Sequence, residues 1–288
     1  MWKLDKDKKI LIVGLGLIGG SYADALTNLG FEVGTITKDQ ESIDYALEHK
    51  MISHGKTEID GDYIGKFDLI VFALYPHVFL EWIEQNQKFI KSDALITDVT
   101  GVKRAVVYKV QEILRDDLEF VGAHPMAGKE VCGVQNASKD IFKKANYIVT
   151  PTLKNTEEAI QACEELGRVM GFRSVKRLSP EDHDEMIGFL SQLTHCIAVS
   201  LMVCKDSEHL VDYTGDSFRD LTRIANINET MWTELFYLNK DELLLQMDLF
   251  KAKLNHLRDC IKKEDTEALY EMMRLSTAQR KLFDKAKE

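Results

Sequence analysis

A glycine-rich turn between a short apolar strand and a helical stretch constrains the fold of this chain more than any other feature. The strand reads KILIV at 9–13, and the hexapeptide GLGLIG follows it at 14–19. Glycines at this spacing suit a tight turn, a close approach of the backbone to a pyrophosphate and close packing of helix on strand. Phosphate is attracted by the free N–H groups at the start of such a helix. The pattern predicts a dinucleotide site made by Gly14, Gly16, Leu17, Ile18 and Gly19.

Short apolar runs alternate with stretches of helical periodicity after this turn. Runs that are apolar along most of their length, separated by helices, predict a parallel sheet with both faces covered. The expected strands are Lys9–Gly14, Phe31–Thr37, Phe67–Leu74, Ala94–Val99, Glu119–Ala123 and Asn146–Thr150, with Phe172–Arg177 as a last edge strand. The clearest helical stretches are Ile18–Leu29, Val78–Phe89 and Val102–Leu114.

Residues that break helices become rare in the last third of the chain. All four prolines lie at or before Pro180, and of the 17 glycines only Gly188 and Gly215 come later. Long stretches with a 3.6-residue period and few breakers are typical of helices. We therefore expect an α/β protein with two domains. A Rossmann-type parallel-sheet domain spans residues 1–180, and an all-helical domain for substrate binding and dimerisation spans 181–288.

The composition narrows the partners and the compartment. The formal charge of −10 argues against nucleic acid and anionic membranes, which attract a basic surface. There is no N-terminal signal peptide and no continuous run of about 18 apolar residues. The cysteines are odd in number and lack the spacing of a disulfide framework or a zinc site. They are Cys132, Cys163, Cys196, Cys204 and Cys260. These features predict a soluble, cytoplasmic protein without a metal site.

The end of the second expected strand bears on the choice between NAD and NADP. An acidic residue at this place commonly holds the ribose hydroxyls of NAD. Here the strand ends in Thr37 and Lys38, and a hydroxyl beside a cation suits a 2′-phosphate. Asp39 follows, and if its carboxylate reaches the ribose, NAD is preferred instead. The sequence favours acceptance of NADP. Leu74 and Tyr75, which end the third expected strand, are also assigned to the cofactor site.

One histidine stands out as a candidate catalyst. His124 directly follows the expected strand Glu119–Ala123 and precedes Pro125. Ligands of open α/β sheets bind beyond the carboxyl ends of the strands, and histidine is the commonest general acid or base. A position at a strand end before a proline therefore favours a catalytic role over that of an ordinary surface histidine.

Two further groups of polar residues lie in the helical part. Asp184, Gly188, Ser191, Gln192 and His195 recur at spacings of three and four, which predicts one polar face on an apolar helix. Such a stripe forms either part of a site or a hydrogen-bond network between helices. Arg219 and Arg223 lie one turn apart. They form either a solvated basic face or a clamp for a carboxylate.

Taken together, these segments resemble the prephenate/arogenate dehydrogenase family of tyrosine biosynthesis. The resemblance covers almost the whole chain and rests on six segments in order. They are GLGLIGGS at 14–21, DVTGVK at 98–103, HPMAGKE at 124–130, HD at 183–184, SQLTH at 191–195, and FRDLTRIA through MW at 218–232.

The resemblance implies a function and roles for particular residues. The implied activity is oxidation of prephenate by NAD or NADP, with loss of CO2, in a homodimer formed through the helical domain. His124 takes the catalytic role, Arg223 binds a substrate carboxylate, and His195 lies in the substrate pocket. Glu130, Gln192 and Trp232 match pocket positions, and Thr100 lies where the family carries a hydroxyl. The usual Gly-Ser order is Thr100-Gly101 here, and Gln192 replaces a histidine found in some members.

Three other interpretations remain open at this point. Arogenate, which carries an ammonium group where prephenate has a keto group, is the alternative substrate. A β-hydroxyacid dehydrogenase resembles this chain in layout, but its helix after the sheet carries a catalytic lysine, which the stretch Gly188–His195 lacks. A dinucleotide-sensing protein without turnover would keep the glycine turn, but it gives no reason for His124 and Arg223.

Overall fold

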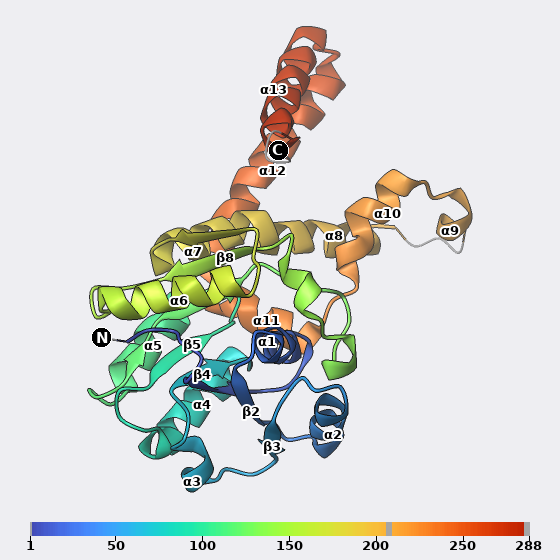
Figure 1. Cartoon of the computed structure of the whole chain (residues 1–288). Coiled ribbons are helices and arrows are strands. Elements are labelled where there is room, and N and C mark those ends of the chain that lie inside the picture. The colour runs from blue at the N-terminus through green and yellow to red at the C-terminus, as the bar shows by residue number, and fades with distance from the viewer. Residues whose placement is uncertain (1, 206–208, 285–288) are drawn as a thin grey trace. The chain divides into compact units, whose positions relative to one another are not determined.

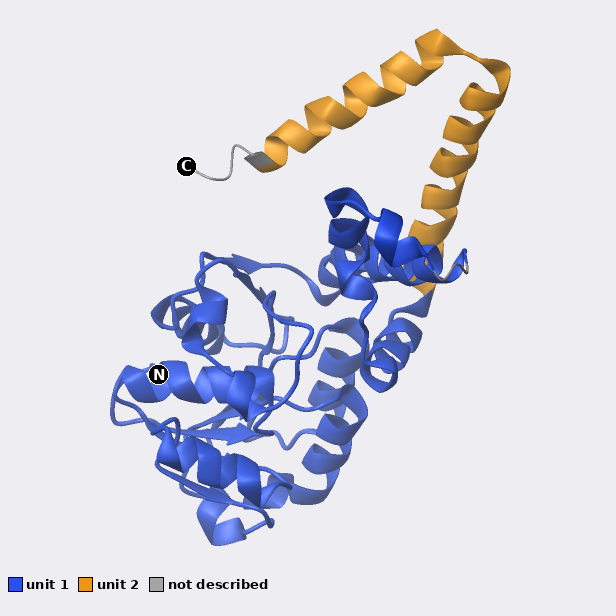
Figure 2. Cartoon of the chain, turned by 90° about the vertical axis from the view of Figure 1, so that its right-hand side faces the viewer, with its two compact units in different colours: residues 1–240 blue, residues 241–288 orange. Residues whose placement is uncertain are grey.

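The computed structural model describes residues 2–205 and 209–284 (Figure 1). By their contacts these residues form two compact units, Met1–Lys240 and Asp241–Glu288 (Figure 2). The expected domain boundary near residue 180 is a different division, and it stays a prediction.

The first unit is built on a six-stranded parallel sheet with the strand order β3-β2-β1-β4-β5-β6. This is the strand order of dinucleotide-binding folds, so the expected fold class is confirmed. The strands are β1 Lys9–Val13, β2 Glu32–Ile36, β3 His54–Lys56, β4 Leu69–Phe72, β5 Leu95–Asp98 and β6 Glu119–Phe120. The short edge strand β3 had no apolar run and was not expected.

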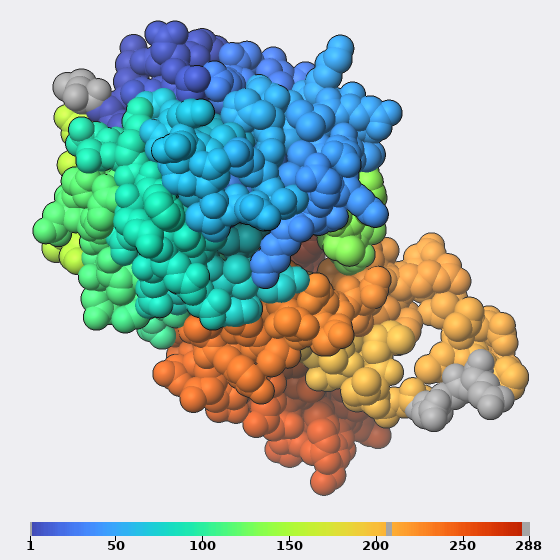
Figure 3. All heavy atoms as spheres, turned by 90° about the horizontal axis from the view of Figure 1, so that it is seen from below, coloured from blue at the N-terminus to red at the C-terminus, as the bar shows by residue number. Residues whose placement is uncertain are grey.

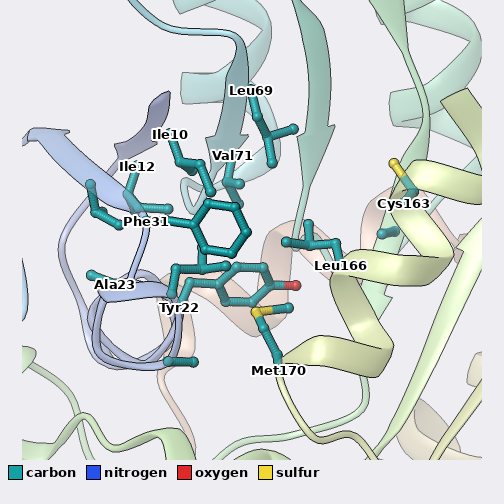
Figure 4. Close-up of a cluster of buried hydrophobic side chains, with 14 of the residues drawn as sticks. Ile10, Ile12, Tyr22, Ala23, Phe31, Leu69, Val71, Cys163, Leu166 and Met170 are labelled. Atoms are coloured by element: carbon teal, nitrogen blue, oxygen red, sulfur yellow. The ribbon is translucent and has the colours of Figure 1, made fainter. Parts of the chain in front are cut away.

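Helices cover both faces of this sheet and enclose two hydrophobic cores (Figure 1). One core lies under α1 Leu17–Asn28, α2 Gln40–Glu48 and α6 Glu157–Val169. The other lies under α3 Gly61–Ile64, α4 Pro76–Asn86 and α5 Arg104–Ile113. In the first core, Tyr22 and Phe31 pack between the sheet and α6, and Tyr22 is completely buried (Figure 4). The strands carry apolar side chains on both faces because each face of the sheet packs against one of these cores.

A second, three-stranded sheet was not expected. It contains β7 Gly122–Pro125, β8 Asn146–Thr150 and β9 Ser174–Arg177 in the order β7-β8-β9. The pair β7/β8 is antiparallel and the pair β8/β9 is parallel. The single strand expected at Glu119–Ala123 therefore divides between two sheets at Val121. His124 lies at the carboxyl end of a strand, as expected, directly before the last residue Pro125 and opposite Ile148, but the strand is β7 of the second sheet and not a strand of the parallel sheet.

From Pro180 onward the described residues form helices joined by short connections and contain no strand, as expected. The elements of the first unit here are α7 Pro180–Ile187, a π-helix at Gly188–Leu193, α8 Thr194–Val203, α9 Leu210–Tyr213, α10 Asp216–Thr222 and α11 Glu229–Leu238. Ser179 caps α7 by accepting a hydrogen bond from the N–H of Asp182, and Pro180 occupies its first turn. Both are signals that start a helix. Short 3₁₀ turns lie at Gln87–Phe89, Val134–Asn136, Lys139–Phe142 and Arg223–Ala225.

The second unit consists of two helices, α12 Lys240–Lys263 and α13 Thr266–Asp284. The turn between them is closed by a hydrogen bond of 3.0 Å from the N–H of Asp265 to the carbonyl of Cys260. Several large apolar side chains of these helices are exposed. They include Leu245, Leu249, Leu254, Ile261, Met273 and Leu275.

The helical stretch Pro180–Val203 is long and apolar enough to cross a membrane by length and composition alone. Core helices of soluble proteins meet the same criterion, so this is weak evidence for a membrane span. The stretch also holds His183 and Asp184, which are buried against the rest of the first unit.

Candidate active site

The turn after β1 has the geometry of a pyrophosphate cradle. Gly14 has φ +94°, in the left-handed region that favours glycine. A Cβ on Gly19 would lie 2.0 Å from the carbonyl oxygen of Gly14, so only glycine lets α1 pack this closely on the turn. A Cβ on Gly16 would meet nothing within 4 Å, and no side chain caps α1. The N–H groups at the start of α1 therefore have no side-chain cap, and the residues fit a dinucleotide.

A substitution at Gly16 separates ligand binding from folding. Gly16→Ala is expected to keep the free energy of unfolding, because the methyl group has room in the protein alone, and to weaken dinucleotide binding about 10–100-fold, because the methyl group occupies the space through which the backbone approaches the pyrophosphate. Gly19→Ala is expected to destabilise the fold itself. Calorimetric titration with a dinucleotide and thermal unfolding of both variants provide the measurement. Unchanged affinity in Gly16→Ala would place the phosphates elsewhere.

Asp39, the acidic residue that follows β2, caps the next helix. The Asp39 carboxylate caps α2 by accepting hydrogen bonds from the N–H groups of Glu41 (3.1 Å) and Ser42 (3.2 Å). The hydroxyl of Ser42 and these N–H groups hold the pKa of Asp39 below its ordinary value. Thr37 follows the strand and donates its N–H to the carbonyl of Lys56 at 3.1 Å. A hollow of about 360 Å³ lies nearby and is lined by Gln40, Lys56, Thr57, Glu58, Ile59 and Asp60.

The loop after β4 connects the glycine turn to α11. A Cβ on Gly14 would meet Leu74 at 2.8 Å, so this loop packs directly on the turn. The next residue, Tyr75, accepts a hydrogen bond of 3.2 Å from the Asn228 amide. At the start of α4, the Glu234 carboxylate accepts the His77 N–H at 2.7 Å and contacts its Nδ1 at 2.8 Å. Figure 3 shows the face on which the α11 segment lies against the α4 segment. Leu74 thus lies beside the turn, and the cofactor contacts expected of Leu74 and Tyr75 stay a prediction.

A buried ion pair organises the loop after β5. Lys103 and Asp98 are both 0% exposed, and the ammonium donates to the carboxylate at 2.7 Å. The same carboxylate accepts the N–H groups of Thr100 and Ala123, each at 3.0 Å. Just before Ala123 the chain passes from the first sheet to β7. The N–H of Ala123 bonds to the Asp98 carboxylate instead of to a neighbouring strand of the first sheet. Burial lowers the pKa of the Lys103 ammonium, and the adjacent Asp98 partly opposes this effect.

This loop corrects the role expected of Thr100. Its hydroxyl is buried, donates to Asp98 or to the carbonyl of Val102 (3.0 Å), and accepts from the Lys103 ammonium at 3.1 Å. Its one hydrogen is used within the loop, so this hydroxyl cannot donate a hydrogen bond to a substrate. Gly101 takes the place next to the catalytic candidate instead, because a Cβ there would lie 3.8 Å from Nε2 of His124.

A second histidine forms a hydrogen bond with one ring nitrogen of His124. Its Nδ1 lies 2.9 Å from Nε2 of His183, whose own Nδ1 lies 2.7 Å from the Asp184 carboxylate. Burial lowers the pKa of His124 well below its ordinary value, and His183 and the Lys103 cation add to this effect. His124 is therefore neutral at neutral pH, as a proton acceptor must be.

A π-helix interrupts the helical stretch from 183 to 204, on which one polar face was expected. The π segment Gly188–Leu193 shifts the periodicity, and π segments occur frequently at functional sites. Asp184 faces the start of α5, where it accepts the N–H groups of Lys103 and Arg104 at 2.8 Å each. Gln192 is 1% exposed and donates to the carbonyl of Leu235 at 2.9 Å. These two residues of the expected polar face therefore bond to different elements, Asp184 to the start of α5 and Gln192 to α11.

The contacts of Gln192 are those of a structural residue. Its carbonyl accepts a hydrogen bond of 2.8 Å from the amide of Asn239, which also donates to the carbonyl of Asp184 at 2.9 Å. The hydrogen-bond network between helices, one of the two readings of the stripe, thus describes Gln192 better than a substrate contact does.

Four other predicted site residues form two contacting pairs. The rings of His195 and Trp232 lie with their centroids 3.8 Å apart. Arg223 and Glu130 form an ion pair, and their charges influence the pKa of His195. Burial is the main reason that the pKa of His195 is lowered. Nδ1 of His195 contacts the carbonyl of Ser191 at 2.8 Å, which leaves Nε2 for a ligand.

The helix α11 links these pairs to His124. It carries Trp232 and, three residues on, Leu235, which lies beside Gly101. The structure therefore brings His124, His195, Trp232, Arg223 and Glu130 around one region of the first unit. Sequence reasoning assigned no role to His183, Asp98 or Lys103. The available signal was the pair His183-Asp184 at the start of an apolar helix.

Two family models cover most of the chain. The model described as prephenate dehydrogenase, nucleotide-binding domain, matches residues 22–176. The model described as prephenate dehydrogenase, dimerization domain, matches residues 179–275. The prephenate dehydrogenase of Bacillus subtilis (strain 168) is 31% identical over 268 residues, which are 91% of this chain and 72% of the relative. The chain belongs to the prephenate dehydrogenase family.

Other members of the family match over nearly their full length. The cyclohexadienyl dehydrogenase of Zymomonas mobilis is 29% identical, covering 92% of each chain. The crystal structure of prephenate dehydrogenase from Aquifex aeolicus in complex with hydroxyphenyl propionate and NAD+ has a TM-score of 0.88 and 30% identity. It covers 96% of this chain and 98% of that one.

Some expectations are not tested by these findings. Among the described residues no group of three His, Cys, Asp or Glu side chains has the arrangement of a metal site. The absence of a metal, of nucleic acid and of a membrane partner stays a prediction, as do the roles assigned to individual site residues.

Proposed function

We propose that this chain is a prephenate dehydrogenase, which converts prephenate to 4-hydroxyphenylpyruvate and CO2 in tyrosine biosynthesis and transfers a hydride to a nicotinamide dinucleotide. The observation that carries the proposal is His124. In a chain of this family it is a neutral imidazole, bonded through Nδ1 to His183, with Nε2 beside Gly101.

The first chemical task of the chain is to accept a proton. Prephenate carries a hydroxyl on C4 of a cyclohexadiene ring. Nε2 of His124 accepts the hydrogen bond of this hydroxyl and stabilises the developing positive charge as the hydride leaves C4. When bound, the oxidised nicotinamide supplies the hydride acceptor. The bond to the ring carboxylate then breaks, CO2 leaves, its electron pair makes the ring aromatic, and the ring oxygen takes its proton back from His124 to give the phenol.

The second task is to hold the carboxylates of the substrate. Arg223 supplies a guanidinium whose fork fits a carboxylate, and His195 and Trp232 provide a polar and an aromatic wall. Glu130 forms an ion pair with Arg223, and a substrate carboxylate bound by Arg223 would compete with it. Glu130 would then be available to the ammonium group of arogenate, so the preference for prephenate rests on the family match and not on this pair.

An activity assay tests the proposal and its alternatives together. The protein is incubated with NAD or NADP and with prephenate, arogenate or a β-hydroxyacid, and the absorbance of the reduced nicotinamide is followed. We expect turnover with prephenate. Preference for arogenate would change the substrate, and turnover of the β-hydroxyacid would change the class of enzyme. Dinucleotide binding without any turnover would indicate a sensing protein.

For the cofactor, we propose that NADP is accepted. The support is that Asp39 is engaged in capping α2, while Thr37 and Lys38 end β2. NAD remains the alternative, since the Aquifex aeolicus structure contains NAD+. Thr37→Asp places a carboxylate where a 2′-phosphate would bind, and we expect it to lower kcat/KM for NADP relative to NAD at least 10-fold, about 1.4 kcal/mol. The variant Thr57→Asp is the control for an added charge nearby. A wild-type enzyme that strongly discriminates against NADP would contradict this proposal.

We also propose that the chain forms a homodimer in the cytoplasm. The dimerization-domain model spans 179–275, and apolar side chains are exposed on helices of this region. In the first unit these include Phe189, Leu190, Met202 and Val203, and a dimer interface would cover surfaces of this kind. The five cysteines are free thiols, which suits a reducing compartment.

A further inference from the structure

Three side chains from two distant parts of the sequence form a line of hydrogen bonds that ends at His124. Asp184 is anchored by the N–H groups of Lys103 and Arg104 at the start of α5, both at 2.8 Å. His183 connects Asp184 to His124 through contacts of 2.7 and 2.9 Å. His183 is 1% and Asp184 0% exposed, so solvent does not offer them other partners.

The direction of this line follows from what each group can donate. A carboxylate only accepts, so the hydrogen between Asp184 and His183 sits on Nδ1 of His183. A neutral imidazole carries one hydrogen, so Nε2 of His183 is an acceptor. The hydrogen between the two histidines then sits on Nδ1 of His124, and Nε2 of His124 keeps its lone pair.

The charges around the two rings favour the neutral state that this reasoning requires. Burial lowers the pKa of His183, as it does that of His124. The buried Lys103 cation acts on both rings in the same direction. Asp184 and Asp98 oppose this effect on His183, but the pKa remains lowered. Each imidazole therefore has one hydrogen at neutral pH.

The opposite tautomer of His124 is disfavoured on both sides of the ring. The Nδ1 lone pair of that tautomer would point at the Nε2 lone pair of His183 at 2.9 Å. Its N–H would occupy Nε2, the atom beside Gly101 where the substrate hydroxyl is proposed to bind. A hydroxyl cannot pass its proton to a nitrogen that already carries one.

We propose that His183 and Asp184 are positioning residues that hold His124 in the Nδ1–H tautomer, so that Nε2 is the acceptor for the substrate hydroxyl. The proposal rests on the proposed function for its kinetic consequence. The tautomer itself does not depend on the substrate.

The tautomer is measured directly in the protein without substrate. In protein labelled with ¹⁵N-histidine, NMR distinguishes protonated from unprotonated ring nitrogens, and the signals of His124 and His183 are assigned by their absence in His124→Asn and His183→Gln. We expect both histidines in the Nδ1–H form. Finding Nε2 of His124 protonated in the wild type would overturn the proposal, even if the protein oxidises prephenate.

Two substitutions of His183 measure the consequence for catalysis. Glutamine can place a carbonyl oxygen near the position of Nε2, so His183→Gln keeps an acceptor for His124. Leucine removes the acceptor. In a serine protease, a substitution that leaves the catalytic histidine in the wrong tautomer lowers kcat about 10⁴-fold. We expect His183→Leu to lower kcat at least about 100-fold and His183→Gln to stay within about 10-fold of the wild type, with similar KM values.

Controls separate positioning from simple damage to the fold. Thermal unfolding and dinucleotide affinity are measured for each variant, and His54→Gln is the control for a part-buried histidine bonded elsewhere, to Tyr63. Equal losses of kcat in His183→Leu and His183→Gln would reduce His183 to a structural role and overturn the proposal. If the wild type does not oxidise prephenate, the proposed function fails, and the NMR measurement still decides the tautomer.

Discussion

Replacing His124 with asparagine is expected to lower kcat for prephenate by about 10²–10⁴-fold, the usual contribution of a general base. The asparagine amide lies near the position of Nδ1, so it can still donate to Nε2 of His183. The atom that is lost is Nε2, the proposed acceptor beside Gly101. Dinucleotide affinity is expected to stay unchanged, because the glycine turn is not altered.

The measurement is kcat at saturating prephenate and dinucleotide, with affinity and unfolding measured on the same samples. His54→Asn serves as the matched control, since His54 lies on β3 and contacts Tyr63 and Glu32. Turnover of His124→Asn within a few-fold of the wild type would remove His124 from the mechanism.

The pH dependence of the wild type adds an independent check on His124. Its pKa is lowered well below the ordinary value of 6.5, and only the neutral ring accepts a proton. Activity controlled by His124 is therefore constant through neutral pH and is lost only as the pH falls through the lowered pKa.

Replacing Lys103 with methionine is expected to lower the free energy of unfolding by about 3–5 kcal/mol, the cost of leaving one member of a buried ion pair alone. Both partners are completely buried, so water cannot compensate the Asp98 carboxylate. Methionine has a similar length and is apolar, so little of the loss comes from packing. The ammonium also donates to Thr100, and that bond is lost as well.

Denaturant unfolding of Lys103→Met is compared with Lys109→Met. Lys109 lies on α5, which begins directly after Lys103, and it pairs with Glu112 on the exposed surface, where such pairs contribute about 0–1 kcal/mol. The double variant Lys103→Met/Asp98→Asn is expected to recover part of the stability, because the uncompensated charge is gone. Equal effects of Lys103→Met and Lys109→Met would show that the buried pair contributes nothing to stability.

Much of the fold was predictable because its signals are local. A strand that is apolar throughout, a glycine turn and a helix of small residues lie next to each other in the sequence, and each requires the others for packing. Ser179 and Pro180 mark the start of α7 in the same local way. The edge strand β3 was missed because three residues, His54–Lys56, carry no periodic signal.

The sequence predicted which residues lie at the site, but it did not predict which hydrogen bonds they form. His124, His195, Trp232, Arg223 and Glu130 were all expected near a substrate, and the structure brings them around one region. Thr100 was assigned to the substrate because members of the family that the sequence resembles carry a hydroxyl at about this position. Only the structure shows its hydroxyl bonded to Asp98 and Lys103, with Gly101 beside His124.

By itself, then, the sequence determined which segments become strands and helices, where a dinucleotide fits and which residue types supply the chemistry. The tertiary structure decided which polar groups become partners. The break at Val121 moves His124 into a second sheet, and the packing of α7 and the π-helix gives Asp184 and Gln192 partners on α5 and α11. The physical reason is distance along the chain. His124 and His183 are 59 residues apart, and the contact between them depends on how whole elements pack, not on the residues next to either one.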